Sequence, residues 1–128
     1  MVKNLKILIS NQSELPIYAQ IKEQIKEQIL DGTIKEGETL PSIRHLAKEA
    51  GVSVITTTRA YNDLEAEGFI SSMQGKGSIV LSRDNELVKE QYLKKIEDSL
   101  MSAINSAERI NINENELIEM LRVLLKER

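Results

Sequence analysis

The chain has 128 residues, enough for one average domain or for a small domain with a helical attachment. Apolar residues make up 41% of the sequence but aromatic residues only 3%, so the core must be built from Ile, Leu, Val and Ala, which suits short, closely packed helices. Seventeen Lys and Arg against twenty Asp and Glu give a formal net charge of −3, which argues against a generally cationic surface for nucleic acid.

The residue types that are missing exclude several function classes. Without Cys the chain has no disulfide scaffold, no thiolate nucleophile and no Cys-ligated zinc. Its single histidine, His45, cannot build a multi-histidine metal site, and we interpret it as a surface residue rather than a pH switch. No stretch approaches the ~20 apolar residues of a membrane span, and residues 1–10 lack a signal-peptide pattern. We therefore expect a cytoplasmic protein with no catalytic residues, no metal, no cofactor and no membrane contact.

The first thirty residues predict a strand and a helix. Apolar residues alternate with polar ones over residues 4–10, which is typical of a short strand. Over residues 16–31 the apolar positions recur at steps of three and four, which predicts an amphipathic helix. Pro16 is suited to its first turn and Gly32 to its C-terminal stop.

Two further helices follow a loop over residues 33–41. Ser42 is placed to cap a helix over residues 43–50, and Ser53 to cap a third helix that extends to Glu67. The break between them is a short turn that contains Gly51. This spacing predicts a helix-turn-helix.

A hairpin is predicted directly after the third helix. Residues 69–73 and 78–82 are typical of strands, and Gly75 and Gly77 between them supply the positive φ angles that a tight turn requires. Three helices followed by a two-stranded hairpin predict a winged helix over residues 1–82. The chain is thus expected to be mainly α with a small β-hairpin wing.

The remaining residues, 83–128, predict two more amphipathic helices. The first starts at about residue 83 and extends for roughly twenty residues, with a break within residues 105–112. Asn113 and Glu116 form a capping box that starts the second.

Two helices of this size cannot close a core by themselves. They either fold back on their own winged helix in a monomer or pair with a second copy as a four-helix bundle, and we favour the second interpretation, a dimerisation segment. The residues expected at that interface are Leu93, Ile96, Leu100, Ile104, Leu117, Leu121 and Leu124.

The third helix has a predicted inner and outer face. At about 100° per residue, one face contains Thr57, Ala60, Tyr61 and Leu64, and the opposite face contains Ile55, Arg59 and Asn62, with Thr58 beside them. In a helix-turn-helix this outer face enters the major groove, where Asn suits adenine, Arg suits guanine or phosphate, and apolar methyl groups suit the thymine methyl. Alternatively, Ile55 packs on the loop before Pro41, and Asn62 is an ordinary solvated residue.

Phosphate contacts are expected from the second helix and the wing. Arg44 and Lys48 lie one turn apart, and Lys76 lies at the hairpin tip. Ser42 and Ser53 lie at helix N-termini, where free N–H groups favour an anion. For Lys48 an ordinary surface role is as good an interpretation.

These motifs resemble a known family. Residues 40–80, LPSIRHLAKEAGVSVITTTRAYNDLEAEGFISSMQGKGSIV, look like the winged-helix domain of GntR-type bacterial transcription regulators, and the short tail resembles the YtrA subfamily. The resemblance implies a homodimeric, usually repressing regulator of a nearby operon, often one that encodes an ABC transporter. Carried over by position, it implies DNA contacts at Arg44, Ser53, Val54, Ile55, Thr56, Thr58, Gly75 and Gly77.

The chain departs from the family at two of these positions. Many members have Arg where this chain has Val54 and Thr58, so base readout here is expected to be more apolar. The predicted ligand is a palindromic double-stranded operator; the alternative is a winged-helix module that binds a protein. Whether a small-molecule effector exists does not follow from the sequence.

The charge divides almost evenly between the two segments. Residues 1–82 carry nine basic and ten acidic side chains, and residues 83–128 carry eight and ten. Asp63, Glu65 and Glu67 lie at the end of the third helix that is expected to point away from DNA. The sequence therefore predicts a small cationic patch, few phosphate contacts and a shallow salt dependence per subunit.

Overall fold

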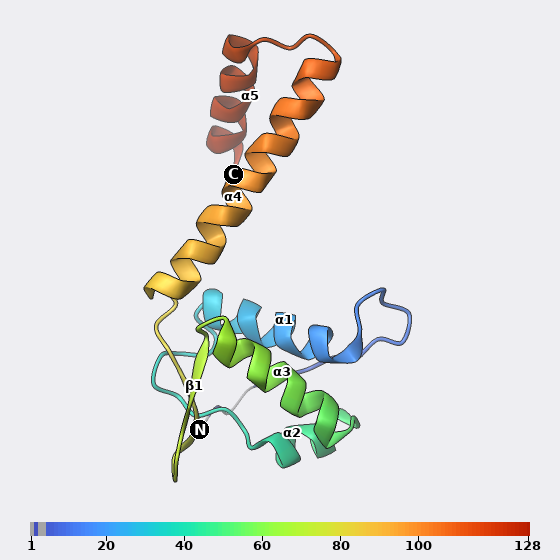
Figure 1. Ribbon diagram of the computed structural model, residues 1–128, viewed down its shortest axis with the longest axis vertical. Helices are drawn as coiled ribbons and strands as arrows, with labels where there is room; N and C mark the ends of the chain where they lie inside the picture. Colours follow the sequence, from blue (N-terminus) through green and yellow to red (C-terminus); the bar gives the residue numbers. More distant parts are fainter. Residues whose placement is uncertain (1, 3–4) are drawn as a thin grey trace. The chain divides into compact units, whose positions relative to one another are not determined.

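The computed structural model describes residue 2 and residues 5–128. Over these residues the chain forms α1 (Ile17–Leu30), α2 (Ile43–Ala50), α3 (Val54–Ala66), β1 (Ile70–Met73), β2 (Gly77–Val80), α4 (Glu86–Arg109) and α5 (Glu114–Glu127). They divide into two compact units, Met1–Lys89 and Glu90–Arg128 (Figure 1). The predicted fold class, mainly α with a small hairpin, is confirmed.

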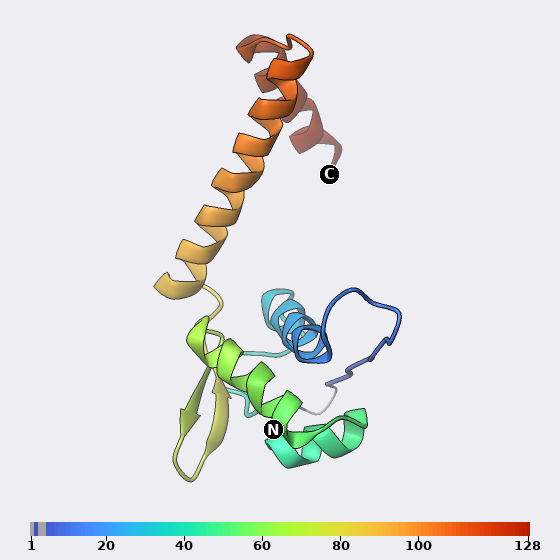
Figure 2. The same ribbon diagram turned by 45° about the vertical axis from the view of Figure 1, so that its right-hand side comes forward.

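Three helices and the hairpin enclose the core of the first unit. Both views show α3 beside α1 and α2, with the hairpin following it (Figures 1 and 2). The predicted inner face of α3 is confirmed, because Thr57, Ala60, Tyr61 and Leu64 are all buried. The other core side chains, each at most 4% exposed, include Ile21, Ile25, Ile34, Leu46, Phe69, Ile70 and Val80.

Local hydrogen bonds set the ends of α2 and α3 as predicted. The Ser42 Oγ accepts from the His45 N–H, and the Ser53 Oγ accepts from the Thr56 N–H, so each serine satisfies an otherwise unpaired donor. Between the helices Gly51 has φ +69°, a conformation that favours glycine. The helix boundaries of the helix-turn-helix are therefore set by Ser42, Gly51 and Ser53.

The hairpin is fixed to the loop that precedes α2. Its strands pair antiparallel, with Ile70 opposite Val80 and Met73 opposite Gly77. On the outer side of β2, the Gly37 N–H donates to the Val80 carbonyl at 2.8 Å and the Leu40 N–H to the Ser78 carbonyl at 2.9 Å. The wing therefore has backbone support on both sides of β2, and the predicted winged helix is confirmed.

The strand predicted over residues 4–10 is wrong. Asn4 lies outside the described residues, and residues 5–10 are extended but pair with no strand. Their backbone groups pair instead with glutamine side chains on α1: the Leu8 N–H donates to the Gln24 Oε1 at 2.8 Å, and the Ser10 N–H to the Gln20 Oε1 at 2.8 Å. The amide groups of both glutamines donate in return, so they act in place of a neighbouring strand.

A row of side-chain pairs joins α1 to α3. The Lys22 ammonium lies 3.1 Å from the Glu67 carboxylate and 3.9 Å from that of Asp63, and the Lys26 ammonium lies 3.0 Å from Glu67. Burial alone would raise the pKa of Glu67, but the hydrogen bonds from Lys26 and Lys22 outweigh it and hold the pKa below its ordinary value.

We expect Glu67→Gln to lower the free energy of unfolding by about 1 kcal/mol at pH 7, since it removes a charge-assisted contact. A carboxyl group whose pKa is lowered by folding stabilises the fold above its unfolded pKa and loses that effect as the pH falls. The difference between the wild type and the variant should therefore shrink below about pH 4.5. Urea unfolding at several pH values measures it, and a difference that is constant down to pH 3 would contradict the assignment.

The first turn of α4 belongs to the first unit. Val88 is only 2% exposed, and the Asn85 side-chain amide donates to the Gly68 carbonyl at 2.9 Å. Leu87 lies directly over Gly68, with side-chain atoms 2.9–3.1 Å from where a Cβ of residue 68 would be. The segment that follows the wing is thus packed against the end of α3.

The second unit consists of the rest of α4 and of α5. The break predicted within residues 105–112 is confirmed, because α4 ends at Arg109 and the turn that follows contains Asn111 at φ 60°. The capping box of Asn113 and Glu116 is confirmed. No helix within the described residues is long and apolar enough to cross a bilayer.

Candidate nucleic-acid interface

The outer face of α3 is exposed and partly apolar. The Ile55 side chain is 83% exposed and Val54 is 44% exposed, while Arg59 and Asn62 are also exposed. Because so little of Ile55 is covered, it does not pack on the loop before Pro41. Val54 and Ile55 are consecutive, so they form a small apolar patch at the start of the helix, and an exposed apolar patch beside polar residues is suited to contact with a partner.

The threonines beside Ile55 are oriented by the helix itself. The Thr58 hydroxyl donates to the Val54 carbonyl at 2.8 Å, and the Ser53 hydroxyl donates to the Thr56 Oγ1 at 2.8 Å. Because the Thr58 hydroxyl already donates within the helix, it can only accept a further hydrogen bond, while its methyl group stays available for apolar contact. This end of α3 is therefore suited to apolar contact more than to hydrogen bonding.

A hollow of about 650 Å³ joins the start of α2 to the wing. Residues 39–45 and 77–78 line it, so the structure brings Ser42, Arg44 and Gly77 together. Lys48 is exposed farther along α2 and does not line the hollow, while Gly75 and Lys76 are exposed in the turn at the wing tip. Of the basic side chains predicted to contact phosphates, Arg44 and Lys48 therefore lie on α2 and Lys76 lies in the wing, and the hollow lies between α2 and the wing.

The tyrosine at the centre of α3 ties this helix to the segment before α2. The Tyr61 hydroxyl donates to the Pro41 carbonyl at 2.6 Å, and burial raises the pKa of the Tyr61 phenol, so it stays protonated as a donor. This bond fixes α3 relative to the residues that lead into Ser42.

The basic side chains of this face are not neutralised. Within the described part of the chain, Arg44, Lys48, Arg59 and Lys76 form no ion pair. The acids at the C-terminal end of α3 are used within the fold instead, since Asp63 and Glu67 pair with α1 and the Glu65 carboxylate accepts from the Ser72 N–H at 3.0 Å. Residues 1–82 carry nine basic and ten acidic side chains, but because these acids are used within the fold, the four basic side chains of this face remain without an ion pair among the described residues.

One contact at this face was missed from the sequence. The Arg59 guanidinium lies over the Tyr18 ring of α1, 3.7 Å from its centroid. Tyr18 reads in the sequence only as part of the apolar stripe of its helix. No sequence signal pairs Tyr18 with Arg59, because the contact joins two helices whose packing the sequence does not specify.

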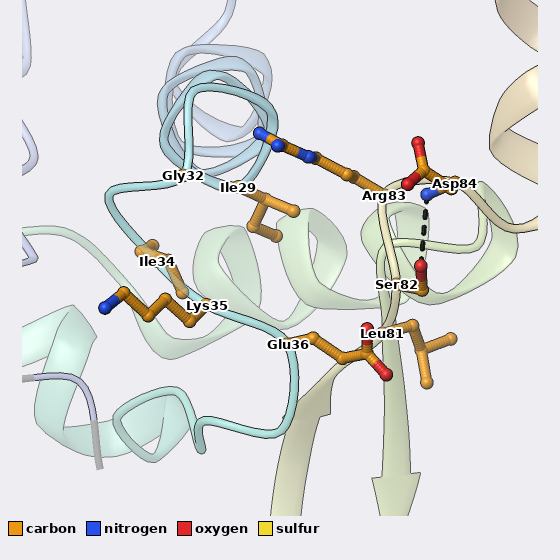
Figure 3. A pocket seen from close by; sticks show the side chains of 9 residues that line it. All are labelled: Ile29, Gly32, Ile34, Lys35, Glu36, Leu81, Ser82, Arg83 and Asp84. Carbon is orange, nitrogen blue, oxygen red and sulfur yellow. Dashed lines mark hydrogen bonds between the residues drawn. The ribbon is translucent and has the colours of Figure 1, made fainter.

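A second hollow, of about 330 Å³, lies away from this face between the end of α1 and the segment after β2 (Figure 3). There the Arg83 guanidinium extends toward Gly32 and donates to the Leu30 carbonyl at 2.7 Å. Lys35 and Arg83 are balanced by Glu36 and Asp84 at its edge. Among the described residues, no group of three or more His, Asp or Glu side chains is placed to hold a metal ion.

Comparisons with known proteins find one consistent family. Residues 17–80 match the family described as bacterial regulatory proteins, gntR family. The HTH-type transcriptional repressor YtrA of Bacillus subtilis is 33% identical over 91% of this chain and 89% of its own length. The solved structure of YtrA from Sulfolobus acidocaldarius, a GntR-family transcription factor, is 34% identical, with a TM-score of 0.65 over 94% of this chain and 97% of that one.

A DNA complex is among the similar structures. The DNA-binding domain of AraR, solved with operator ORX1, is 34% identical and matches 61% of this chain and 98% of its own with a TM-score of 0.53. The similarity therefore includes a protein whose DNA-binding domain was solved in complex with an operator.

Proposed function

Because the chain belongs to the GntR family of bacterial regulatory proteins and is a DNA-binding transcriptional regulator rather than an enzyme, we propose that it is a repressor that binds a palindromic operator as a homodimer. The N-terminal half of α3 enters the major groove, and the wing tip at Gly75, Lys76 and Gly77 enters the minor groove. The controlled operon lies near its own gene, and a transporter operon there would fit the subfamily.

The observation that carries this proposal is the outer face of α3. It combines Ile55, 83% exposed, with Arg59 and Asn62, and its cations are not paired within the described residues. Arg44 and Gly77, which line one hollow, supply phosphate contacts beside it. The methyl groups of Ile55 suit the thymine methyl group in the major groove, and the donors of Arg59 and Asn62 beside them suit base edges or phosphates.

Dimerisation is supported by the second unit. Its apolar side chains are uncovered: Leu93, Ile96 and Leu100 of α4 are 49–56% exposed, and Leu121 and Leu124 of α5 are 47% and 62% exposed. Among the described residues of this unit, only Ala107 is buried. Two copies supply four amphipathic helices, the number that a bundle needs.

A gel shift with the promoter region of the chain's own gene tests the function. We expect a saturable, salt-sensitive shift that survives an excess of unrelated competitor DNA. If competitor abolishes the shift, binding is non-specific; if there is no shift, the exposed apolar start of α3 serves a protein partner instead. Either result would overturn the operator proposal.

We expect Ile55→Ala to lower operator affinity about tenfold per half-site, since burying roughly two of the three carbons that it removes, at ~0.8 kcal/mol each, corresponds to about that factor. Affinity for unrelated DNA should not change, because that term depends on phosphate contacts. Leu8→Ala is the matched control, since Leu8 is 79% exposed in the segment along α1. Titrations of both variants against operator and unrelated duplexes measure the effect, and unchanged operator affinity would remove Ile55 from the interface.

A further inference from the structure

The contacts between α1 and α3 form a row with a regular step. Tyr18, Lys22 and Lys26 follow one another at four-residue spacing on α1. Arg59 and Asp63 of α3 and Glu67, its C-cap residue, have the same spacing. Tyr18 contacts Arg59, Lys22 contacts Asp63 and Glu67, and Lys26 contacts Glu67. The two helices therefore lie side by side in the same direction (Figure 1).

The first step of this row differs from the others in its chemistry. In the contacts of Lys22 and Lys26 with Glu67, a lysine of α1 lies beside a carboxylate at the end of α3, so both charges are neutralised within the fold. In the first step the cation is on α3 and its partner is an aromatic ring, 3.7 Å from the guanidinium to the ring centroid. A ring attracts the cation without neutralising it, and a guanidinium stacked flat on a ring keeps its N–H edges available in its own plane.

We propose that Tyr18 is a positioning residue for DNA binding, which holds the Arg59 guanidinium at the flank of α3 so that it donates to a backbone phosphate beside the major groove. The inference rests on the proposed operator binding. A phosphate is the target rather than a base because the ring draws Arg59 toward α1, away from the exposed tip of α3 at Ile55. Arg59 then arrives already ordered, so less conformational entropy is lost on binding.

The experiment is a double-mutant cycle in the full chain, with a duplex that the wild type selects from a random library as the probe. Tyr18→Leu should weaken binding about two- to fivefold per protomer, the range expected of one exposed cation–π contact. Tyr18→Phe, which keeps the ring, should bind like the wild type. In an Arg59→Ala background Tyr18→Leu should have no further effect, because the group that it positions is gone.

Two readouts separate positioning from a purely structural role. Arg59→Ala should reduce the slope of log affinity against log salt by about one per protomer, with base preference unchanged. Arg59→Lys should keep that slope and lose less affinity on Tyr18→Leu than the wild type does, since an ammonium is still attracted to the ring but lacks the planar stack of a guanidinium. In the free protein, the upfield shift of the Arg59 side-chain protons over the ring should be lost in Tyr18→Leu and kept in Tyr18→Phe.

Several results would overturn the inference. Equal losses from Tyr18→Leu with and without Arg59 would show that Tyr18 acts on the fold, and a loss in Tyr18→Phe would show that the hydroxyl contacts DNA directly. Relaxed base preference in Arg59→Ala with an unchanged salt slope would assign Arg59 to a base. If the wild type selects no duplex at all, operator binding fails as well, so the two failures are distinguishable.

Discussion

Leu100→Glu is expected to convert the chain from a dimer to a monomer and to lower operator affinity at least about 100-fold, since a second attached head contributes about 10²–10⁴ to avidity. The Leu100 side chain is 49% exposed on α4 between Ile96 and Ile104, which are 55% and 38% exposed. In a bundle of two copies, the substitution would place a carboxylate from each protomer in an apolar interface. Burying such unpaired charges costs several kcal/mol, more than one missing apolar contact.

Ser102→Glu is the matched control, because it adds the same charge to the opposite side of the same helix, two residues on. Sedimentation at micromolar concentration should show two chains per particle for the wild type and Ser102→Glu, and one for Leu100→Glu. Leu124→Glu, on α5, should behave like Leu100→Glu if both helices contribute to the bundle. A dimer that survives both Leu100→Glu and Leu124→Glu would remove these faces from the interface.

The elements that the sequence predicts well are those whose ends are set by their own residues. Ser42 and Ser53 cap α2 and α3, and Asn113 caps α5, so each start depends only on hydrogen bonds within four residues. The glycines that end α2 and α3 act through positive φ, which is also local. The order of helix, turn, helix and hairpin, and with it the candidate interface, follows from these signals.

The errors concern contacts between distant residues. Period-two alternation indicates an extended segment over residues 5–10, but it does not indicate which groups form hydrogen bonds with its backbone. Here the side chains of Gln20 and Gln24 do so in place of a neighbouring strand. In the same way, the sequence indicates only that Tyr18 is one more apolar residue of its helix. Its contact with Arg59 joins residues 41 positions apart and depends on the packing of α1 on α3. No periodicity within one helix encodes such a pair.

Gly68→Ala is expected to lower the free energy of unfolding by about 3 kcal/mol, the largest stability effect among the single changes considered. Gly68 follows α3 at φ +86°, where an L side chain costs about 1–2 kcal/mol. A Cβ there would also lie 2.9 Å from the Leu87 Cδ2 and 3.0 Å from the Leu87 Cβ. The second distance involves an atom fixed to the backbone, so a rotamer change alone does not relieve it, and overpacking adds about 1–3 kcal/mol.

Gly37→Ala separates the two contributions, because Gly37 has nearly the same φ, +88°, and nothing within 4 Å of an added Cβ. It should lose only the conformational part, about 1 kcal/mol. Urea unfolding of both variants at one protomer concentration measures the difference, since the proposed dimer would make stability depend on concentration. Equal losses would mean that the first turn of α4 moves aside at little cost, whereas a larger loss for Gly68→Ala would confirm that Leu87 is closely packed on Gly68 at the end of α3.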